Sequence, residues 1–212
     1  MTELAPIATL NPAIYHTREG RKAGKLRSAG RAVACTEIRV ADEQGADVLR
    51  GTVGEVLVRG PNVMQGYWNA DDQTRAAFRD GWLRTGDAAY MDADGFIFVV
   101  DRYKDMIKSG GENVFSAEVE NALGSHPAVA TSAVIGVPSE AWGEAVHAVV
   151  VVEPGCTVTA EDLVAHCKQH IAGYKCPRSI EFRANLPLSG AGKVLKTALR
   201  EPHWRDRDRR VA

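Results

Sequence analysis

The segment around Asp94-Gly95 constrains the fold of this chain more than any other feature of the sequence. It lies within "AAYMDADGFIFVV" (residues 88–100), where apolar and aromatic residues flank the dipeptide on both sides. Asp-Gly accepts the left-handed backbone of a tight turn, so this segment predicts two antiparallel strands joined there. Residues 36–40 and 54–60 alternate apolar and polar side chains, as half-buried strands do. The first half of the chain therefore predicts a mostly β unit.

The pattern changes after Arg102, where helices and strands begin to alternate. Strands are expected over 129–138, 144–152 and 178–183, and helices over 116–126, 159–171 and 196–204. This alternation predicts an α+β fold, with a β-rich unit over 1–102, a smaller α+β unit over 103–205 and a frayed tail over 206–212.

Helix ends are predicted from caps and prolines. Asp71 or Asp72 is expected to cap a short helix over 71–78, and Thr159 to cap the helix that follows it. Pro127 and Pro202 are expected to end the helices before them, because proline lacks the N–H that a helix interior needs.

Bulk composition excludes several classes of partner. The 212 residues carry a formal net charge of -1, which gives no global attraction to nucleic acid or an anionic membrane. No apolar run is long enough for a membrane span, and the N-terminus lacks the features of a signal peptide. A basic cluster within residues 18–31 is typical of a solvated face, with phosphate binding as the alternative. The four cysteines show no CxxC pair and predict reduced thiols in a cytoplasmic protein: Cys35, Cys156, Cys167 and Cys176.

Asp87 is the first candidate site residue. It follows Gly86 at what we expect to be a turn, where a carboxylate could accept hydrogen bonds from the two vicinal hydroxyls of a ribose. A turn-stabilising role is the alternative. Asp92 and Asp94 lack the spacing of an EF-hand calcium loop, so they are assigned to the hairpin turn.

A second candidate lies in "DRYKDMIKSGGENVFSAEVE" (residues 101–120), a charged stretch around a double glycine just before a predicted helix. Arg102 and Lys108 could supply positive charge to phosphates, and Gly110-Gly111 could let a ligand approach the backbone. A charged linker would have a similar composition. The stretch lies where the β unit gives way to the α+β unit, which is where a hinge is expected.

The third candidate is Lys193 in "PLSGAGKVLK" (residues 187–196). The segment fails the Walker pattern, because Pro187 replaces the first glycine and Val194 replaces the hydroxyl residue. What remains is a glycine-containing turn that presents Lys193 as a point charge, suited to a phosphate or carboxylate oxygen.

His166 and His170 lie four residues apart beside Cys167, a spacing that raises the possibility of a zinc site. No further ligand is evident nearby in the sequence. The same helix has an apolar stripe with the histidines at its margin, so helix packing is the favoured interpretation.

Taken in order, four stretches resemble motifs in the C-terminal part of the adenylate-forming acyl-CoA synthetases: "GEVLVRGPNVMQGYWN", "GWLRTGDAAYMDADGF", "DRYKDMIKSGGENVFSAEVE" and "LPLSGAGKVLKTALR". The resemblance implies ATP-dependent, AMP-forming activation of a carboxylic acid, fatty or aryl, to its acyl-CoA. The reaction runs through an acyl-adenylate, with Mg-ATP and coenzyme A as co-substrates.

The resemblance also implies roles for the residues on the nucleotide side of the site. Asp87 matches the carboxylate that holds the ribose hydroxyls, and Arg102 matches the arginine beside the nucleotide. The start of the chain, "MTELAP", resembles a Tyr-Gly-Met-Thr-Glu motif entered at its methionine. Thr2 and Glu3 then match the residues that contact the α-phosphate and the magnesium ion.

Further residues match the family's small mobile domain. Lys104 occupies the hinge position, and Lys108, Gly110 and Gly111 match the segment that lines the site during thioester formation. Lys193 matches the catalytic lysine that steadies carboxylate and phosphate oxygens during adenylation. A rotation that exchanges Lys193 for the glycine turn would let one cavity host both steps.

The resemblance covers only part of a synthetase. Residues 1–102 match the last β-rich subdomain of the large domain, and 103–205 match the whole mobile domain. The family's phosphate loop and acyl pocket have no counterpart in this sequence. We therefore expect a truncated enzyme, with an inactive remnant or the interaction half of a split synthetase, completed by a separate large-domain polypeptide, as the alternatives.

Overall fold

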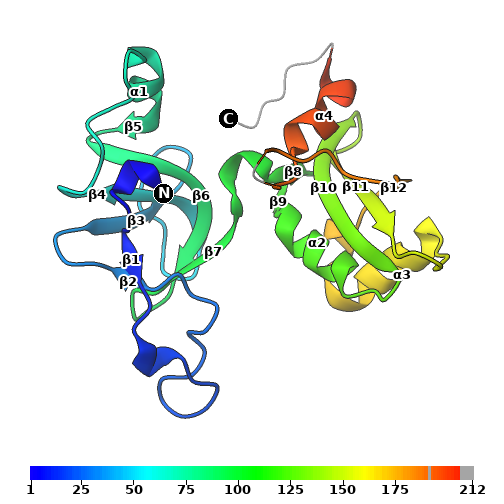
Figure 1. The fold of residues 1–212 in the computed structure, drawn as a ribbon, viewed down its shortest axis with the longest axis horizontal. Helices are drawn as coiled ribbons and strands as arrows, with labels where there is room; N and C mark the ends of the chain where they lie inside the picture. Colours follow the sequence, from blue (N-terminus) through cyan, green and yellow to red (C-terminus); the bar gives the residue numbers. More distant parts are fainter. Residues whose placement is uncertain (191, 206–212) are drawn as a thin grey trace. The chain divides into compact units, whose positions relative to one another are not determined.

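The structure, a computed structural model, describes residues 1–190 and 192–205 (Figure 1). The chain forms two compact units that divide between Tyr103 and Lys104. They are called unit 1 and unit 2, and each is described by itself. The predicted frayed tail at 206–212 lies outside the described residues.

Unit 1 is built on an antiparallel sheet of five strands in the order β3-β4-β6-β5, with β7 also paired to β6. A two-stranded ribbon of β1 and β2 lies outside this sheet. The elements are η1 (Thr2–Leu4), β1 (Thr9–Leu10), η2 (Ala13–Tyr15), β2 (Arg31–Ala32), β3 (Glu37–Ala41), β4 (Val53–Arg59), α1 (Asp71–Ala77), β5 (Phe78–Arg79), β6 (Trp82–Met91) and β7 (Ile97–Arg102).

The predicted hairpin at Asp94-Gly95 is confirmed as the connection between β6 and β7. One carboxylate oxygen of Asp92 accepts hydrogen bonds from the backbone N–H groups of Asp94 and Phe96, which closes the turn. The ammonium of Lys25 forms ion pairs with both Asp92 and Asp94, at 2.9 Å for Asp94. The two carboxylates therefore hold a lysine from the predicted basic cluster.

Unit 2 has a five-stranded sheet in the order β10-β11-β8-β9, and β12 pairs with β11 in parallel. Its elements are η3 (Tyr103–Asp105), which begins at the boundary, β8 (Ile107–Ser109), β9 (Glu112–Val114), α2 (Ser116–Gly124), β10 (Val129–Ser139), β11 (Gly143–Val152), α3 (Ala160–His170), η4 (Gly173–Lys175), β12 (Ser179–Phe182) and α4 (Lys196–Trp204).

The helices of unit 2 cover the sheet on both faces because strand residues alternate between them. On β11, Val146 and Val150 pack with Leu163 of α3 in one core cluster. Val149 faces the other way and packs with Leu199 of α4 in a second cluster. Helices α2 and α3 therefore bury one face, and α4 buries the other.

The predictions about helix ends have different outcomes. The N-cap at Thr159 is confirmed and is part of a capping box: the Thr159 hydroxyl accepts the Asp162 N–H, and the Asp162 carboxylate accepts the Thr159 N–H. The predicted aspartate cap of α1 is wrong: the helix begins at Asp71, and its N-cap residue Ala70 has no capping side chain. Asp71 and Asp72 instead lie in the first turn, where acids favour the helix dipole.

Pro202 does not end α4, contrary to the prediction, but lies inside the helix. The indole N–H of Trp204 donates to the carbonyl of Gly136 at 2.9 Å, which anchors the last turn to the sheet. A tertiary contact thus overrides the local preference.

The four cysteines are free thiols, as predicted. Among the residues described, no helix is long and apolar enough to cross a membrane.

Candidate active site

Asp87 lies in strand β6 and is not at a turn, which corrects the expectation from its glycine neighbour. It is paired across the sheet with Arg102 of β7. Arg102 Nη1 lies 3.2 Å from Asp87 Oδ1, so two predicted nucleotide-binding residues are brought together as an ion pair. The pairing of β6 with β7 continues past Asp87, with a register shift between Ala88 and Ala89.

The backbone around Asp87 is held by polar groups behind it. Gly86 adopts a positive φ of 70°, a conformation that glycine accepts without strain. Its N–H donates to Glu55 Oε1 at 3.2 Å, while the Arg84 guanidinium donates to Glu55 Oε2 at 2.9 Å. The Thr85 hydroxyl accepts the Asp87 N–H and donates to the carbonyl of Val56 on β4. Asp87 is therefore positioned by a buried network.

The electrostatic environment of Asp87 contains opposing effects. Burial raises the pKa of its carboxyl, and the neighbouring Arg102 guanidinium acts in the opposite direction. The Asp87 side chain is 31% exposed, which leaves the carboxylate accessible to a ligand.

A cavity of about 290 Å³ opens beside this carboxylate within unit 1. Asp87 lines it together with Met1 and Leu4, which flank Thr2 and Glu3 in the sequence. Glu3 accepts a hydrogen bond from the Tyr67 hydroxyl at 3.1 Å. Burial raises the pKa of the Tyr67 phenol, so the hydroxyl keeps its proton and remains a donor. The N-terminal turn and Asp87 thus border the same cavity.

In unit 2, Gly110-Gly111 forms the turn between β8 and β9, so a strand separates the double glycine from the helix. Both glycines have positive φ, at 61° and 86°. A Cβ on Gly110 would lie 2.8 Å from the ring of Trp142, whereas one on Gly111 would meet nothing within 4 Å. The backbone N–H of Lys108 donates to the buried carboxylate of Glu144 at 3.2 Å.

Lys104 lies at the start of unit 2, in the short helix η3. Arg200 of α4 donates to the carbonyl of Lys104 and forms a buried ion pair with Asp105 at 2.8 Å. This arginine ties the first residues of unit 2 to its last helix.

Lys193 is exposed on a loop whose ends are joined by a bridge between Leu188 and Val194. The Ser189 hydroxyl accepts the Lys193 N–H at 3.1 Å, and the Ser189 N–H donates back to the Lys193 carbonyl at 2.7 Å. The backbone is held locally while the ammonium is presented to solvent.

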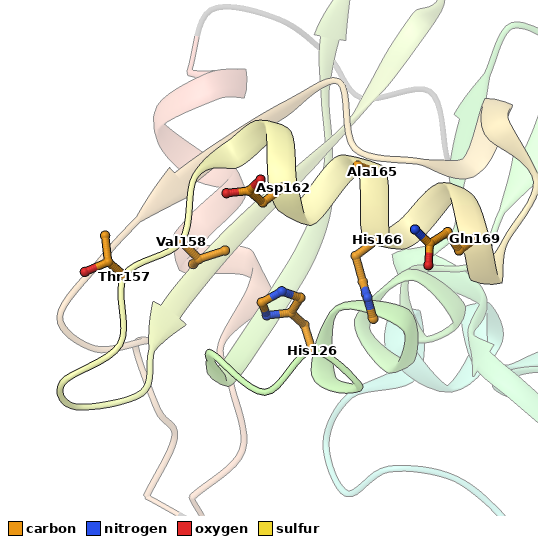
Figure 2. Close-up of a pocket in the computed structure, with 7 residues that line it drawn as sticks. All are labelled: His126, Thr157, Val158, Asp162, Ala165, His166 and Gln169. Atoms are coloured by element: carbon orange, nitrogen blue, oxygen red, sulfur yellow. The ribbon is translucent and has the colours of Figure 1, made fainter.

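A separate cavity of about 380 Å³ lies between α3 and the loop after α2 (Figure 2). None of the predicted site residues lines it. His126 and His166 point into this region in Figure 2, and one ring nitrogen of each, Nδ1 of His126 and Nε2 of His166, has a protein partner. His166 Nε2 lies 2.8 Å from the Ser125 hydroxyl, and His170 Nδ1 lies 2.9 Å from the His166 carbonyl. This supports helix packing over the zinc hypothesis.

Sequence reasoning missed three charged residues that hold the site segments: Glu55, Glu144 and Arg200 are all buried. The sequence did contain a signal for them, because each is a charged residue at an inward-facing position of an otherwise apolar strand or helix. A buried charge requires a partner, so each of these residues could have been expected to contact a nearby polar segment.

Comparisons with known proteins cover both units. Residues 1–68 match the family described as AMP-binding enzyme, and residues 118–193 match the AMP-binding enzyme C-terminal domain. A feruloyl-CoA synthase of Amycolatopsis sp is 47% identical over 201 residues, which are 94% of this chain and 40% of that protein. A long-chain-fatty-acid–CoA ligase of Yersinia pestis is 46% identical over 95% of this chain and 34% of its own length.

Solved structures give the same picture. The o-succinylbenzoate CoA synthetase of Bacillus subtilis, in complex with its acyl-adenylate intermediate, matches with a TM-score of 0.84 and 38% identity. ATP-bound MatB of Rhodopseudomonas palustris matches with a TM-score of 0.81 and 35% identity. Each comparison covers 94% of this chain and 39% of the other. The chain thus spans about two fifths of the length of these relatives.

Proposed function

Because the chain belongs to the adenylate-forming AMP-binding enzymes and corresponds to their C-terminal part, we propose that it serves the ATP-dependent, AMP-forming conversion of a carboxylic acid to its acyl-CoA. Relatives named for feruloyl-CoA and for long-chain fatty acids favour an aryl or fatty acid as substrate. The observation that carries the proposal is Asp87, held by a buried network at the edge of a cavity.

Asp87 and Arg102 would bind the nucleotide. A carboxylate can accept hydrogen bonds from both ribose hydroxyls, and the Arg102 contact restrains its orientation. Burial raises the pKa of Asp87, which means that burial disfavours its charged form. The ribose hydroxyls would donate hydrogen bonds to that charged form and would therefore stabilise it when the nucleotide binds. Thr2 would contact the α-phosphate from the N-terminal turn that borders the same cavity.

Glu3 fits the role of a magnesium ligand. Mg²⁺ in nucleotide sites commonly takes one or two protein carboxylates, with phosphates and water completing the shell. The Tyr67 hydroxyl occupies Oε1 of Glu3, and a carboxylate retains acceptor sites beyond that one. The ion would neutralise charge on the phosphate oxygens, and Glu3 would hold it close to the α-phosphate contact of Thr2.

Unit 2 would supply different residues to the two half-reactions. Lys193 would donate to the carboxylate and phosphate oxygens as charge develops during adenylation, and its exposed ammonium suits that role. Lys108, Gly110 and Gly111 would line the site during thioester formation. Lys104 would act as the hinge, with Arg200 securing its carbonyl to unit 2.

Carboxylate-dependent ATP–pyrophosphate exchange tests this proposal. The chain is assayed alone and together with the part of the feruloyl-CoA synthase that lies outside the matched residues. We expect exchange in the combined sample and a loss of about 100-fold or more with Lys193→Ala, because one preorganised donor contributes on that scale. Asp87→Asn should raise the KM for ATP.

Lys168→Ala provides the control, since Lys168 is an exposed lysine of the same unit and lies on α3. Equal activity of wild type and Lys193→Ala would overturn the role of Lys193. If neither the chain alone nor the combined sample shows exchange, the result would instead support the hypothesis of an inactive remnant.

A second candidate function is that of an interaction half, which completes a synthetase supplied by another polypeptide. Ile7 and Val99, 52% and 50% exposed, line the rim of the cavity beside Asp87. Leu10 is also 59% exposed on strand β1. Exposed apolar residues gathered around a site favour a protein partner there. Co-purification with the large-domain polypeptide should fall when Ile7 is replaced by Ser, whereas Lys193→Ala should leave it unchanged.

A further inference from the structure

Unit 2 contains a group of three metal-binding side chains that the proposed function does not use. His147, Glu181 and His203 each place a ligand atom within 4.8 Å of the others. We propose that these residues bind a divalent transition metal ion of the zinc type, which fastens the end of helix α4 to the sheet. This site is separate from the magnesium that would accompany ATP in unit 1.

The fold brings the three residues together from distant parts of the sequence. On β11, His147 alternates with Val146 and Ala148, whose side chains enter the core on the other face of the sheet. The His147 side chain therefore points to the face covered by α4. Strand β12 runs parallel to β11 with His147 opposite Ser179, so Glu181 lies two residues farther along. His203 belongs to the last turn of α4.

The strongest observation is an unpartnered nitrogen on a buried histidine. His147 is 7% exposed, and its Nε2 has no hydrogen-bond partner. Its Nδ1 lies 2.7 Å from the Ser179 hydroxyl. In the tautomer that donates from Nδ1 to Ser179, Nε2 presents a lone pair toward Glu181 and His203, which is how a metal-ligating imidazole is normally oriented. A buried nitrogen left in this state requires an explanation, and an ion supplies one.

The neighbouring carboxylate is oriented in a complementary way. Arg183 Nε donates to Glu181 Oε1 at 2.6 Å, while Oε2 lies 3.7 Å from His147 Nε2. A tetrahedral ion with bonds near 2.0–2.1 Å places its ligands about 3.3 Å apart, so this pair needs only a small adjustment. Arg183 acts as the outer partner that leaves one carboxylate oxygen for the ion.

The donor set identifies the class of metal. Two imidazoles and one carboxylate suit zinc and neighbouring first-row ions, with a water molecule as the fourth ligand. Mg²⁺ prefers an all-oxygen octahedral shell and is excluded by the two nitrogens.

The histidines of α3 provide an internal contrast. His126 and His166 also lie close together, with ring centroids 5.0 Å apart, but Nδ1 of His126 and Nε2 of His166 each contact a protein group (Figure 2). Proximity of histidines is therefore not the criterion. The His147 group differs because its central nitrogen, His147 Nε2, is buried without a hydrogen-bond partner, and its nearest ionic neighbour, Glu181 Oε2, lies 3.7 Å away.

The test is metal binding by the full chain without an affinity tag, after removal of metal with a chelator. Zn²⁺ is titrated in competition with a chromophoric chelator, and Co²⁺ is used as a spectroscopic probe. We expect one tight site, visible Co²⁺ absorption without a sulfur charge-transfer band, and a Zn²⁺-dependent rise in the melting temperature. His203→Gln should weaken Zn²⁺ binding by at least about tenfold and abolish the rise.

His170→Gln is the matched control, because His170 also lies in the last turn of a helix and belongs to the other histidine group. It should bind Zn²⁺ as wild type does. His203 is chosen over the buried His147, whose replacement could unfold the unit. The proposal is overturned if wild type binds no Zn²⁺, if His203→Gln binds normally, or if His170→Gln removes the tight site. Mg²⁺ at the same concentration should not raise the melting temperature.

Discussion

The two units hold their candidate site segments with the same device, a buried glutamate on a central strand. In unit 1, Glu55 accepts the N–H of Gly86, and in unit 2, Glu144 accepts the N–H of Lys108. Both glutamates are 5% exposed. The surroundings differ. The second oxygen of Glu55 takes the Arg84 guanidinium, whereas Glu144 lies against Gly136, where a Cβ would come within 2.4 Å of its carboxylate.

This contrast shows two ways to keep a carboxylate inside a sheet. In unit 1, the Arg84 guanidinium pairs with the buried carboxylate of Glu55. In unit 2, the absence of a Cβ at Gly136 leaves room for the buried carboxylate of Glu144. Unit 1 is therefore expected to be sensitive to loss of a polar group, and unit 2 to a gain of volume. Substitutions at these positions separate the two mechanisms.

The largest effect is expected for Glu55→Ala. The change leaves the Gly86 N–H and the Arg84 guanidinium without their partner, which should cost about 3 kcal/mol in the free energy of unfolding of unit 1. Urea denaturation followed by circular dichroism measures the loss. Glu37→Ala is the control, since the Glu37–Arg59 pair is exposed and should contribute far less than a buried network does. Equal losses for the two variants would show that the buried network contributes nothing special.

Gly136→Ala should be next in size. The added methyl group would overlap the Glu144 carboxylate, and Ile107 Cγ2 lies only 3.2 Å from its position. Overpacking of this kind should destabilise unit 2 by about 2 kcal/mol, measured in the same urea experiment. Gly124→Ala is the matched control, because nothing lies within 4 Å of its Cβ position. A Gly136→Ala protein as stable as wild type would remove the steric half of the comparison.

A smaller difference is expected between the two glycines of the β8–β9 turn. Alanine at either position is strained by its positive φ, but only Gly110→Ala would also displace Trp142. Gly110→Ala should therefore be less stable than Gly111→Ala by about 1 kcal/mol. It should also change the tryptophan fluorescence, which Gly111→Ala should leave unaltered. The reverse order would contradict the packing of Trp142 against the turn.

The smallest effect concerns the pH dependence of Asp87. Its raised pKa means that the folded protein binds this proton more tightly than the unfolded chain does. The resulting stability is present below the unfolded pKa of about 3.9 and is lost as pH rises through the folded value. Asparagine does not titrate. The stability of Asp87→Asn relative to wild type should therefore increase between about pH 3 and pH 7.

Thermal unfolding of the two proteins across this pH range measures that effect. A relative stability that falls as pH rises would mean that the Arg102 contact outweighs burial. The same variant should impair nucleotide binding, so a gain in stability with a loss of function would mark Asp87 as a functional residue.

The sequence by itself determined the local structure and the chemical lineage. The Asp94-Gly95 hairpin, the N-cap at Thr159 and the strand over residues 144–152 depend on neighbouring residues, so they could be predicted from short-range rules. The family could be assigned because four ordered motifs occur in one chain. The predicted aspartate cap of α1 and the predicted end of α4 at Pro202 were wrong. In α4, the hydrogen bond from Trp204 to Gly136 holds the turn around the proline, and a local rule does not include such a contact.

Only the tertiary structure decided which side chains meet. Glu55 lies behind Asp87, and Arg200 secures Lys104, through contacts between residues far apart in the sequence. His147, Glu181 and His203 form one group because a parallel strand and a helix converge on the same face of β11. Short-range patterns carry no information about such convergence, because it depends on how strands pair and on which face each helix covers.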